Sequence, residues 1–421
     1  MIQRALYTAL LYGLLPVLPL RLAWRARKQP EYLQHVGERF GFYTARPTKP
    51  IIWLHAVSVG ETRAAASLIK LFQARNPHYQ ILLTHMTPTG RATSVELWGD
   101  SILRCYLPYD YPFAVRKFLR HFLPRLGILL ETELWPNLIA ICHEQNVPLA
   151  LVNARLSERS ARGYRRFPAL TSDALNQLAL FAAQTDADGE RLQSLFSGHV
   201  TIIGNLKFDN DVPAAQVALG KKLRQQFGAA RPVWLAASTR DGEEKLLLET
   251  LKKIQTLSAL AVIVPRHPQR FNEVAVLLKA NSIAFQPRSD NAIIAPTTRV
   301  VLGDSMGEMF AYFAASDVAF IGGSLLPLGG QNLIEACAVG TPVLIGPHTF
   351  NFAEATEQAI ACGAAQRIAD NADLAKEIDR LLADAARRQA MAQAGLAFTA
   401  RHRGAAERAY ALVSSLLDRR A

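Results

Sequence analysis

The sequence predicts an α/β protein built from two doubly wound domains in tandem. From about residue 50 onward, short and almost continuously apolar segments alternate with helical patterns. A polar stretch, residues 204–216, interrupts this alternation, which then begins again. Strands that helices bury on both faces have this continuous apolar character, as in a parallel sheet. The length of 421 residues also suits two domains better than one.

The N-terminal segment, residues 1–28, is predicted to associate with a membrane. Residues 5–20 carry no charge, but a transmembrane helix needs about 20 apolar residues, and Pro16 and Pro19 interrupt the run. Most of the charges follow the run instead of preceding it, which disfavours a secretory signal. We expect a membrane anchor or an interfacial helix, with a buried N-terminal helix as the alternative. Residues 1–50 carry eight Lys or Arg and two Glu. If the segment spans the membrane, this excess keeps the rest of the chain on the cytoplasmic side. If it only lies on the surface, the same charges hold it to anionic lipid.

Composition narrows the classes of partner. With 50% hydrophobic and 19% charged residues, a disordered chain is excluded. The formal net charge of +12 indicates an anionic partner, either nucleic acid, a phospholipid surface or a phosphorylated substrate. Nucleic acid is disfavoured because no stacking platform or nucleic-acid motif is present. The four cysteines show no metal-ligand spacing, so we expect mainly buried free thiols, in keeping with a reducing compartment.

Each domain has its own series of predicted strands. In residues 29–206 they are IIWLH, QILLTH, LGILLE, PLALVN, LFAAQT and VTIIGN. In residues 207–395 they are PVWLAAS, AVIVPR, RVVLGD, DVAFIGG and PVLIGP, and residues 396–421 are predicted as a C-terminal helix. Open parallel sheets bind ligands beyond the carboxyl ends of their strands, and two facing sheets would form a cleft. Polar residues directly after strands are therefore the candidates for a site.

Glu61 ends the heptapeptide HAVSVGE, between an apolar strand and an alanine-rich helix. Ser58 and Glu61 match the capping box, in which Glu61 would accept a hydrogen bond from the Ser58 N–H. A helix N-terminus also lowers the pKa of a carboxyl group and keeps it ionised. Because a general base must be ionised before it takes a proton, the local pattern leaves a capping role and a catalytic role open.

Other charged residues follow strands of the first domain. Glu131 and Glu133 end a strand in LLETELWPN, and Pro136 favours a helix start there, so these acids could equally be a helix N-terminal pair. Lys207, in GNLKFD, lies at the predicted junction between the domains.

The segment NARLSERSARGYRRF contains five arginines and one glutamate directly after a predicted strand. Arginine side chains suit a phosphorylated or acidic acceptor, whereas a solvated loop is the alternative. The candidate acceptor-binding residues are Arg155, Arg159 and Arg162.

Three stretches of the second domain suit a phosphate or a ribose. PRHPQRF brings a guanidinium and an imidazole to the end of a strand, and the MGEM turn opens a helix whose free N–H groups suit a phosphate. In GGQNLIEA, an asparagine and a glutamate three residues apart share one helix face, although glycines at such turns are also needed structurally. The candidates are Arg266, His267, Met306, Gly307, Glu308, Asn332, Leu333, Ile334 and Glu335.

Seven stretches occur in the order they have in the 3-deoxy-D-manno-octulosonic acid (Kdo) transferases of Gram-negative lipopolysaccharide synthesis, and the chain resembles that family over nearly its whole length. They are HAVSVGE, ETELWPN, NARLSERSARGY, GNLKFD, PRHPQRF, GDSMGEM and GGQNLIEACAVGTPVLIGPHTFNF. The last two alone resemble many GT-B glycosyltransferases and indicate only that superfamily.

The resemblance implies a GT-B fold, with two Rossmann-like domains facing a central cleft, and transfer of Kdo from CMP-Kdo to lipid IVA with inversion. It implies no cofactor, no catalytic metal and no nucleic-acid partner, and a place on the cytoplasmic face of the inner membrane. The family's general base falls on Glu61, and its transition-state support falls on Glu131 and Lys207. Its CMP contacts fall on 266–267, 306–308 and 332–335.

Two alternative functions fit parts of the same sequence. A sugar-nucleotide 2-epimerase would share the GT-B-like fold, but the apolar N-terminus and the arginine-rich segment argue against it. A membrane-tethered protein that only binds a nucleotide-sugar would keep its function without Glu61.

Overall fold

The computed structural model describes residues 2–27 and 29–418, which divide into two units. Unit 1 takes the chain up to Asn210 and again from His402, and unit 2 takes Asp211–Arg401. The sequence predicts the boundary after residue 206, and the structure has it after Asn210. Residues 1, 28 and 419–421, which belong to the predicted N-terminal segment and C-terminal helix, lie outside the described residues.

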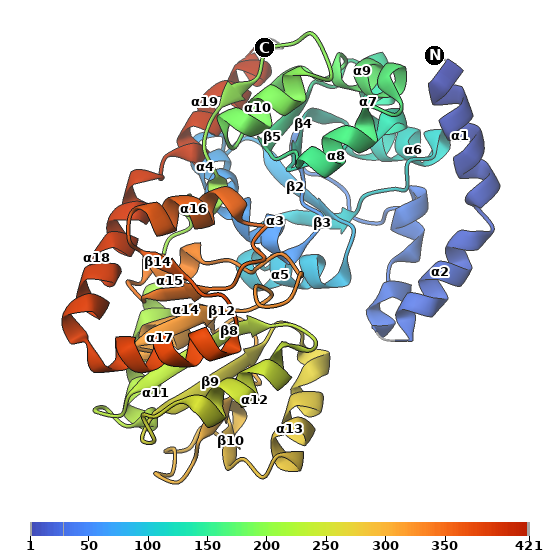
Figure 1. Ribbon diagram of the computed structural model, residues 1–421. Coiled ribbons are helices and arrows are strands. Elements are labelled where there is room, and N and C mark those ends of the chain that lie inside the picture. Colours follow the sequence, from blue (N-terminus) through green and yellow to red (C-terminus); the bar gives the residue numbers. More distant parts are fainter. Residues whose placement is uncertain (1, 28, 419–421) are drawn as a thin grey trace. The chain divides into compact units, whose positions relative to one another are not determined.

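In the described part of the chain, unit 1 contains a seven-stranded parallel sheet with the order β3-β2-β1-β4-β5-β6-β7. Helices lie on both of its faces (Figure 1). The strands are β1 (Ile51–His55), β2 (Gln80–His85), β3 (Leu103–Tyr106), β4 (Pro124–Leu130), β5 (Leu149–Ala154), β6 (Leu180–Ala183) and β7 (Thr201–Ile202). The helices between them are α3 (Val59–Ala64), α4 (Ala66–Arg75), α5 (Pro88–Trp98), α6 (Pro112–Phe122), α7 (Pro136–Glu144), α8 (Glu158–Tyr164), α9 (Pro168–Leu175) and α10 (Asp186–Gln193).

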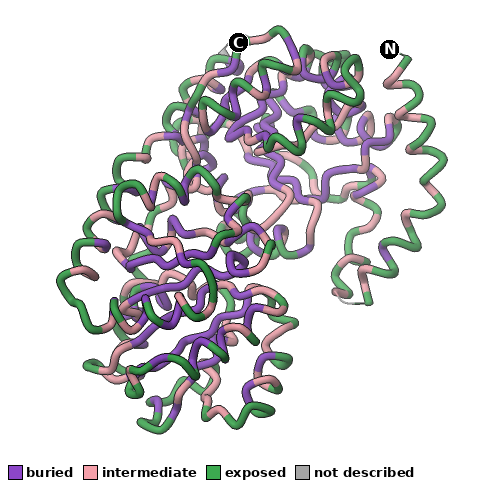
Figure 2. The backbone as a smooth tube through the Cα atoms, viewed as in Figure 1, coloured by how far each residue is buried: buried purple, intermediate pink, exposed green. Residues whose placement is uncertain are grey.

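The side chains of β1 alternate between two apolar layers, which is why this strand reads as continuously apolar. Trp53 lies in one layer, with its ring 4.9 Å from that of Phe118 in α6. Leu54 lies in the other, together with Phe72 of α4 and Val413 near the C-terminus. Figure 2 shows the strands as the buried part of the chain.

Gly127, in β4, lies where a side chain has no room. A Cβ atom there would lie 2.8 Å from Cε3 of Trp53 and still closer to Leu149. We expect Gly127→Ala to lower the free energy of unfolding by about 1–3 kcal/mol, as overpacking does. The matched control is Gly163→Ala in α8, where an added Cβ meets nothing within 4 Å. Denaturation of both variants checks this, and equal stability of the two would contradict the packing.

Unit 2 contains a second parallel sheet, whose described strands have the order β10-β11-β9-β8-β12-β13-β14. They are β8 (Val233–Thr239), β9 (Leu260–Pro265), β10 (Phe285–Pro287), β11 (Val300–Leu302), β12 (Val318–Ile321), β13 (Val343–Ile345) and β14 (Ala365–Arg367). Its helices are α11 (Ala214–Phe227), α12 (Glu243–Lys253), α13 (Phe271–Ala280), α14 (Met309–Ala315), α15 (Ile334–Ala338), α16 (Ala353–Ala361), α17 (Asn371–Ala383) and α18 (Ala385–Arg401). Both units are therefore doubly wound, as predicted.

The predicted single helix over residues 396–421 is wrong. α18 ends at Arg401, and α19 (Ala405–Asp418) packs against α4 of unit 1. The Asp209 carboxylate accepts hydrogen bonds of 2.5 Å from the N–H groups of Gly404 and Ala406, at the break between the two helices. The second segment thereby returns to the first unit and completes its core.

The N-terminal segment forms two helices, α1 (Ile2–Leu14) and α2 (Val17–Ala26), with a bend of 60° between them. Among the described residues no single helix has the length and apolar character to cross a membrane, although this bent pair would pass by length and composition alone. Of the four free cysteines, Cys105, Cys142 and Cys337 are buried and Cys362 is exposed, which largely confirms the prediction.

Candidate active site

Two acidic residues of unit 1 follow neighbouring strands at the point where the strand order reverses. β1 leads to Glu61 in α3, and β4 leads directly to Glu131. In doubly wound sheets this is the point where ligands bind. Glu131 has φ +58°, in the left-handed region that residues other than glycine seldom adopt.

The hydrogen bonds of Glu61 differ from the predicted capping box. Its carboxylate accepts 2.8 Å hydrogen bonds from the Val57 N–H and from the Ser58 hydroxyl, and the Ser58 side chain does not cap α3. The prediction that Glu61 accepts a hydrogen bond from the Ser58 N–H is therefore wrong, since the backbone donor is the Val57 N–H. Two donors nevertheless hold the carboxylate in one orientation.

The expected direction of the Glu61 pKa is also wrong. Burial, followed by the charge of Glu131, raises the pKa of Glu61 to about 8. Its hydrogen bonds from Val57 and Ser58 lower the pKa, and Glu133 raises it. The helix was expected to dominate, but α3 has only six residues, and desolvation outweighs it. A carboxyl group with this pKa can exchange a proton near neutral pH.

Lys207 and Glu131 form an ion pair that is largely withdrawn from water. The Lys207 ammonium donates to Glu131 Oε1 at 2.8 Å, and the two side chains are 13% and 20% exposed. The sequence places Lys207 at the start of the second domain, whereas the structure places it in unit 1, in the 3-10 helix η3 (Leu206–Asp209). Asn153, buried at the end of β5, accepts a 3.0 Å hydrogen bond from the Leu206 N–H and so positions η3.

Glu133 extends this group, and its loop is tied to the backbone of Arg155. Glu133 accepts a 2.8 Å hydrogen bond from Trp135 Nε1, and burial raises its pKa to about 7. The Thr132 hydroxyl donates to the Arg155 carbonyl oxygen, which ties the loop after β4 to the arginine-rich segment. Two negative charges thus lie within electrostatic range of Glu61.

Arg159 and Arg162 lie on α8 and are exposed. Neither pairs with a carboxylate among the residues that the structure describes. The arginine-rich segment is therefore a short helix whose cations face water, and the structure does not join these two to the acidic group.

In unit 2, the loops after β9 and β12 meet. Arg266 directly follows β9, and its Nε donates to Gln331 Oε1 at 3.3 Å. The Asn332 amide nitrogen donates to Glu335 Oε1 at 3.1 Å, and its oxygen accepts from the Ile334 N–H at 3.1 Å. The structure thus joins Arg266 to Gln331, the residue before Asn332, and it confirms that Asn332 and Glu335 share a face.

The other predicted residues of unit 2 differ in burial and in the polar groups that they offer a ligand. The pKa of His267 is lowered, first by burial and then by Arg266, which favours a neutral imidazole. Glu308 accepts from the Ser305 hydroxyl at 2.6 Å and from Arg288 at 3.3 Å. The remaining residues of the prediction are the half-exposed Met306, Gly307 with φ +78°, and the buried Leu333 and Ile334. The buried pair offers a ligand little beyond its backbone.

Glu243 is a residue of this site that the sequence did not reveal. It is fully buried in α12, after β8, and its carboxylate accepts hydrogen bonds of 2.5–3.1 Å from the N–H groups of Gly323, Ser324 and Leu325. It therefore holds the glycine-containing loop after β12, across the point where the strand order reverses. The only sequence signal is an acid after a strand, in TRDGEE.

A metal site is not suggested by the described side chains, since no three His, Cys, Asp or Glu residues among them could hold an ion together.

Known protein families match both halves of the chain. The model of the 3-deoxy-D-manno-octulosonic-acid transferase family matches residues 34–210, and that of group 1 glycosyl transferases matches residues 279–397. A 3-deoxy-D-manno-octulosonic acid transferase of Bordetella pertussis is 45% identical over 420 residues, 96% of this chain and 97% of the relative.

Solved structures share the fold at low identity. A glycosyltransferase of Rickettsia africae is 13% identical with a TM-score of 0.61, over 88% of this chain and 99% of its own. A UDP-GlcNAc 2-epimerase of Neisseria meningitidis is 18% identical with a TM-score of 0.55, over 88% of this chain and 100% of its own. The two units are thus GT-B-like, but the fold alone does not separate a transferase from an epimerase. The 45% identity to the transferase of Bordetella pertussis, over 96% of this chain, does separate them.

Proposed function

Because this chain belongs to the 3-deoxy-D-manno-octulosonic acid (Kdo) transferase family, we propose that it transfers Kdo from CMP-Kdo to a hydroxyl group of lipid IVA. The family makes the chain a glycosyltransferase. The donor, the acceptor, the inverting course and the place on the cytoplasmic face of the inner membrane belong to the proposal. The observation that carries it is the group of Glu61, Glu131 and Lys207 beyond the carboxyl ends of β1 and β4.

Glu61 is the general base of this reaction. A sugar hydroxyl is a poor nucleophile until a base takes its proton. The Glu61 carboxylate accepts that proton while the acceptor oxygen bonds to the anomeric carbon of Kdo. The bond from that carbon to the CMP phosphate oxygen breaks, and its electron pair leaves with CMP. Direct displacement inverts the anomeric configuration.

Lys207 and Glu131 act together in the same step. Negative charge develops as CMP departs, and an ammonium group with little exposure stabilises it more strongly than water does. Glu131 accepts the hydrogen bond that fixes this ammonium at 2.8 Å. A positioned charge needs no reorganisation when the bond breaks.

Unit 2 holds the CMP part of the donor. Arg266 supplies a guanidinium for phosphate, and Glu335 supplies an acceptor for ribose hydroxyls. Glu243 keeps the Gly323–Leu325 loop in place through three backbone N–H groups.

The test of the function is mass spectrometry of the product made by the purified chain from CMP-Kdo and lipid IVA. The expected product is lipid IVA with one or more added Kdo units, and one CMP is released for each Kdo transferred. A nucleotide-sugar that returns as its epimer, or a donor that binds without turnover, would support the alternatives instead.

The pH dependence of kcat/KM is expected to follow the pKa of Glu61. Since this pKa is raised to about 8, the base is mostly protonated at pH 7, so activity should rise with pH and level off above about 8. Glu133→Gln removes a negative charge that raises this pKa, so its profile should shift to lower pH. Glu158→Gln, at an exposed glutamate paired with Arg165, is the matched control with an unshifted profile. Coinciding profiles for all three proteins would contradict the assignment.

A further inference from the structure

Helix α1 has its polarity reversed relative to a helix of a water-exposed domain. Such a helix normally buries an apolar stripe and exposes a polar one. In α1 the partly buried stripe consists of Gln3, Arg4, Tyr7, Thr8 and Leu11. The opposite face carries exposed apolar side chains, and none of the helix's residues is buried. Those that are at least 43% exposed are Ile2, Leu6, Leu10, Tyr12 and Leu14.

A buried carboxylate on unit 1 holds the polar stripe. Asp110, 3% exposed, accepts hydrogen bonds from the Tyr7 hydroxyl at 3.0 Å and from the N–H groups of Asn137 and Leu138 at 3.0 and 2.7 Å. The Thr8 hydroxyl donates to the Asn137 side chain at 2.9 Å. Burial of this carboxyl group is offset only while these donors remain in place.

Further polar contacts fix both ends of the helix. Gln3 accepts from the Leu170 N–H at 2.8 Å, and the Leu11 carbonyl accepts from the Tyr111 hydroxyl at 2.7 Å. Since every one of these contacts is on the inner side, α1 packs along the rest of unit 1 with its apolar face outward. Figure 2 shows the exposure of α1 and α2 along their length.

The exposed face continues from α1 onto α6. The ring of Tyr12 lies 6.5 Å from that of Phe113. The Lys117 ammonium lies 5.8 Å from the Phe113 ring and 3.7 Å from the Phe42 ring, which is 61% exposed.

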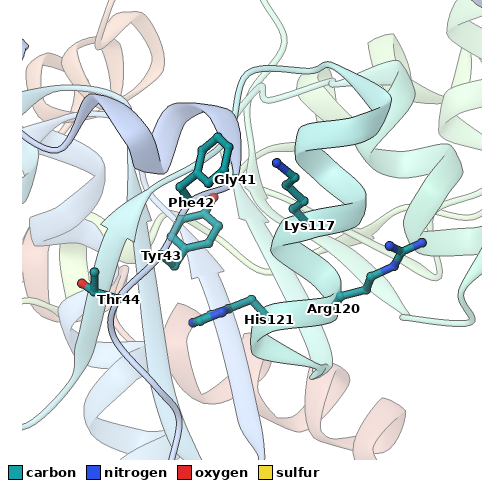
Figure 3. A pocket seen from close by; sticks show the side chains of 7 residues that line it. All are labelled: Gly41, Phe42, Tyr43, Thr44, Lys117, Arg120 and His121. Atoms are coloured by element: carbon teal, nitrogen blue, oxygen red, sulfur yellow. The ribbon is translucent and has the colours of Figure 1, made fainter.

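Here the surface opens into a hollow of about 440 Å³, lined by Gly41, Phe42, Tyr43, Thr44, Lys117, Arg120 and His121. Figure 3 shows Lys117 pointing toward Phe42, whereas Arg120 extends away from it. His121 Nε2 donates a 2.6 Å hydrogen bond to the Ala45 carbonyl oxygen. Neither Lys117 nor Arg120 has a carboxylate partner among the described residues. Cations that point apart suit several headgroups of a surface rather than one small anion held between them.

We propose that the outward face of α1 and the Phe42–Lys117–Arg120 hollow form one preformed surface for an anionic phospholipid bilayer, on which α1 lies flat instead of crossing. This inference rests on the proposed function, which places the chain at the inner membrane, and it specifies the surface that contacts that membrane. Apolar side chains enter the acyl boundary and the cations meet phosphates, as in interfacial helices. The docked polar stripe cannot face acyl chains, which excludes a spanning α1 while its contacts with unit 1 persist.

Binding of the purified full-length chain to preformed vesicles tests the surface. Vesicles of phosphatidylcholine alone are compared with vesicles that also contain phosphatidylglycerol. We expect Leu6→Ser/Leu10→Ser to weaken binding to both at least about tenfold, because two side chains lose their transfer from water. Lys117→Gln/Arg120→Gln should weaken binding only to the anionic vesicles. The matched control is Leu257→Ser/Ile293→Ser, at unit 2 residues that are 72% and 81% exposed, with unchanged binding.

Two further measurements distinguish binding to the bilayer surface from a spanning helix and from a dimer contact. A cleavable tag placed ahead of Met1 should stay open to protease outside the vesicles, and its protection would show a spanning helix. Equal vesicle binding by all variants, or a dimer that Leu6→Ser/Leu10→Ser dissociates without any vesicle binding, would overturn the proposal. Kdo transfer by the unaltered chain to detergent-dispersed acceptor reports the chemistry separately. Vesicle binding without such transfer would support the proposed membrane surface and contradict the proposed function.

Discussion

Glu61→Gln is expected to reduce kcat for Kdo transfer about 10²- to 10⁴-fold, the usual contribution of a general base. The amide has the size of the carboxylate and can still accept a hydrogen bond from the Val57 N–H, so the loop after β1 should persist. It cannot take the acceptor proton. Steady-state kinetics with CMP-Kdo and lipid IVA measure the loss, and thermal unfolding measures the fold.

Ser58→Ala is the control that separates the structural role of the Glu61 hydrogen bonds from the role of Glu61 as a base. It removes the 2.8 Å hydrogen bond to Glu61 but leaves the carboxylate. Its stability should fall as much as that of Glu61→Gln or more, whereas its rate should fall far less. Because this hydrogen bond lowers the Glu61 pKa, the Ser58→Ala profile should also move to higher pH. A Glu61→Gln enzyme with full activity would leave only the structural role.

Central strands of both sheets were predictable and three edge strands were not. The predicted segments cover β1 and β4 at the centre of one sheet, and β8 and β12 at the centre of the other. The strands that the patterns miss are β3, β10 and β14, which all lie at sheet edges. A strand paired on one side needs less apolar character, so β3 (LRCY) and β14 (AQR) give little periodic signal.

The candidate site was predictable as residue positions but not as contacts. Strand ends and motif order bring Glu61, Glu131 and Lys207 into view, whereas their protonation depends on burial that only the fold produces. A capping pattern suggests a lowered pKa, and desolvation reverses it. Likewise Asn153 and Glu243 act through hydrogen bonds to backbone 53 and about 80 residues away, and no local pattern reports such partners.

Lys207→Met is expected to reduce kcat about 10²- to 10³-fold, comparable to the loss of one preorganised donor in other enzymes. The substitution keeps the length and the apolar stem of the side chain and removes only the ammonium. It also leaves Glu131 without its 2.8 Å partner at 20% exposure, so the free energy of unfolding should fall by about 1–3 kcal/mol. Lys49→Met, at an exposed lysine that donates to the Pro77 carbonyl, is the matched control and should change neither quantity much.

The double variant Glu131→Gln/Lys207→Met distinguishes a working pair from two independent charges. If Glu131 serves to fix the ammonium, its loss matters little once the ammonium is gone, so the double variant should be about as slow as Lys207→Met alone. It should also recover stability, because no unpaired carboxylate remains beside the end of β4. Independent roles would instead multiply the two losses in rate. That outcome would place Glu131 in contact with the substrate, and its left-handed backbone would then serve to aim its own side chain rather than that of Lys207.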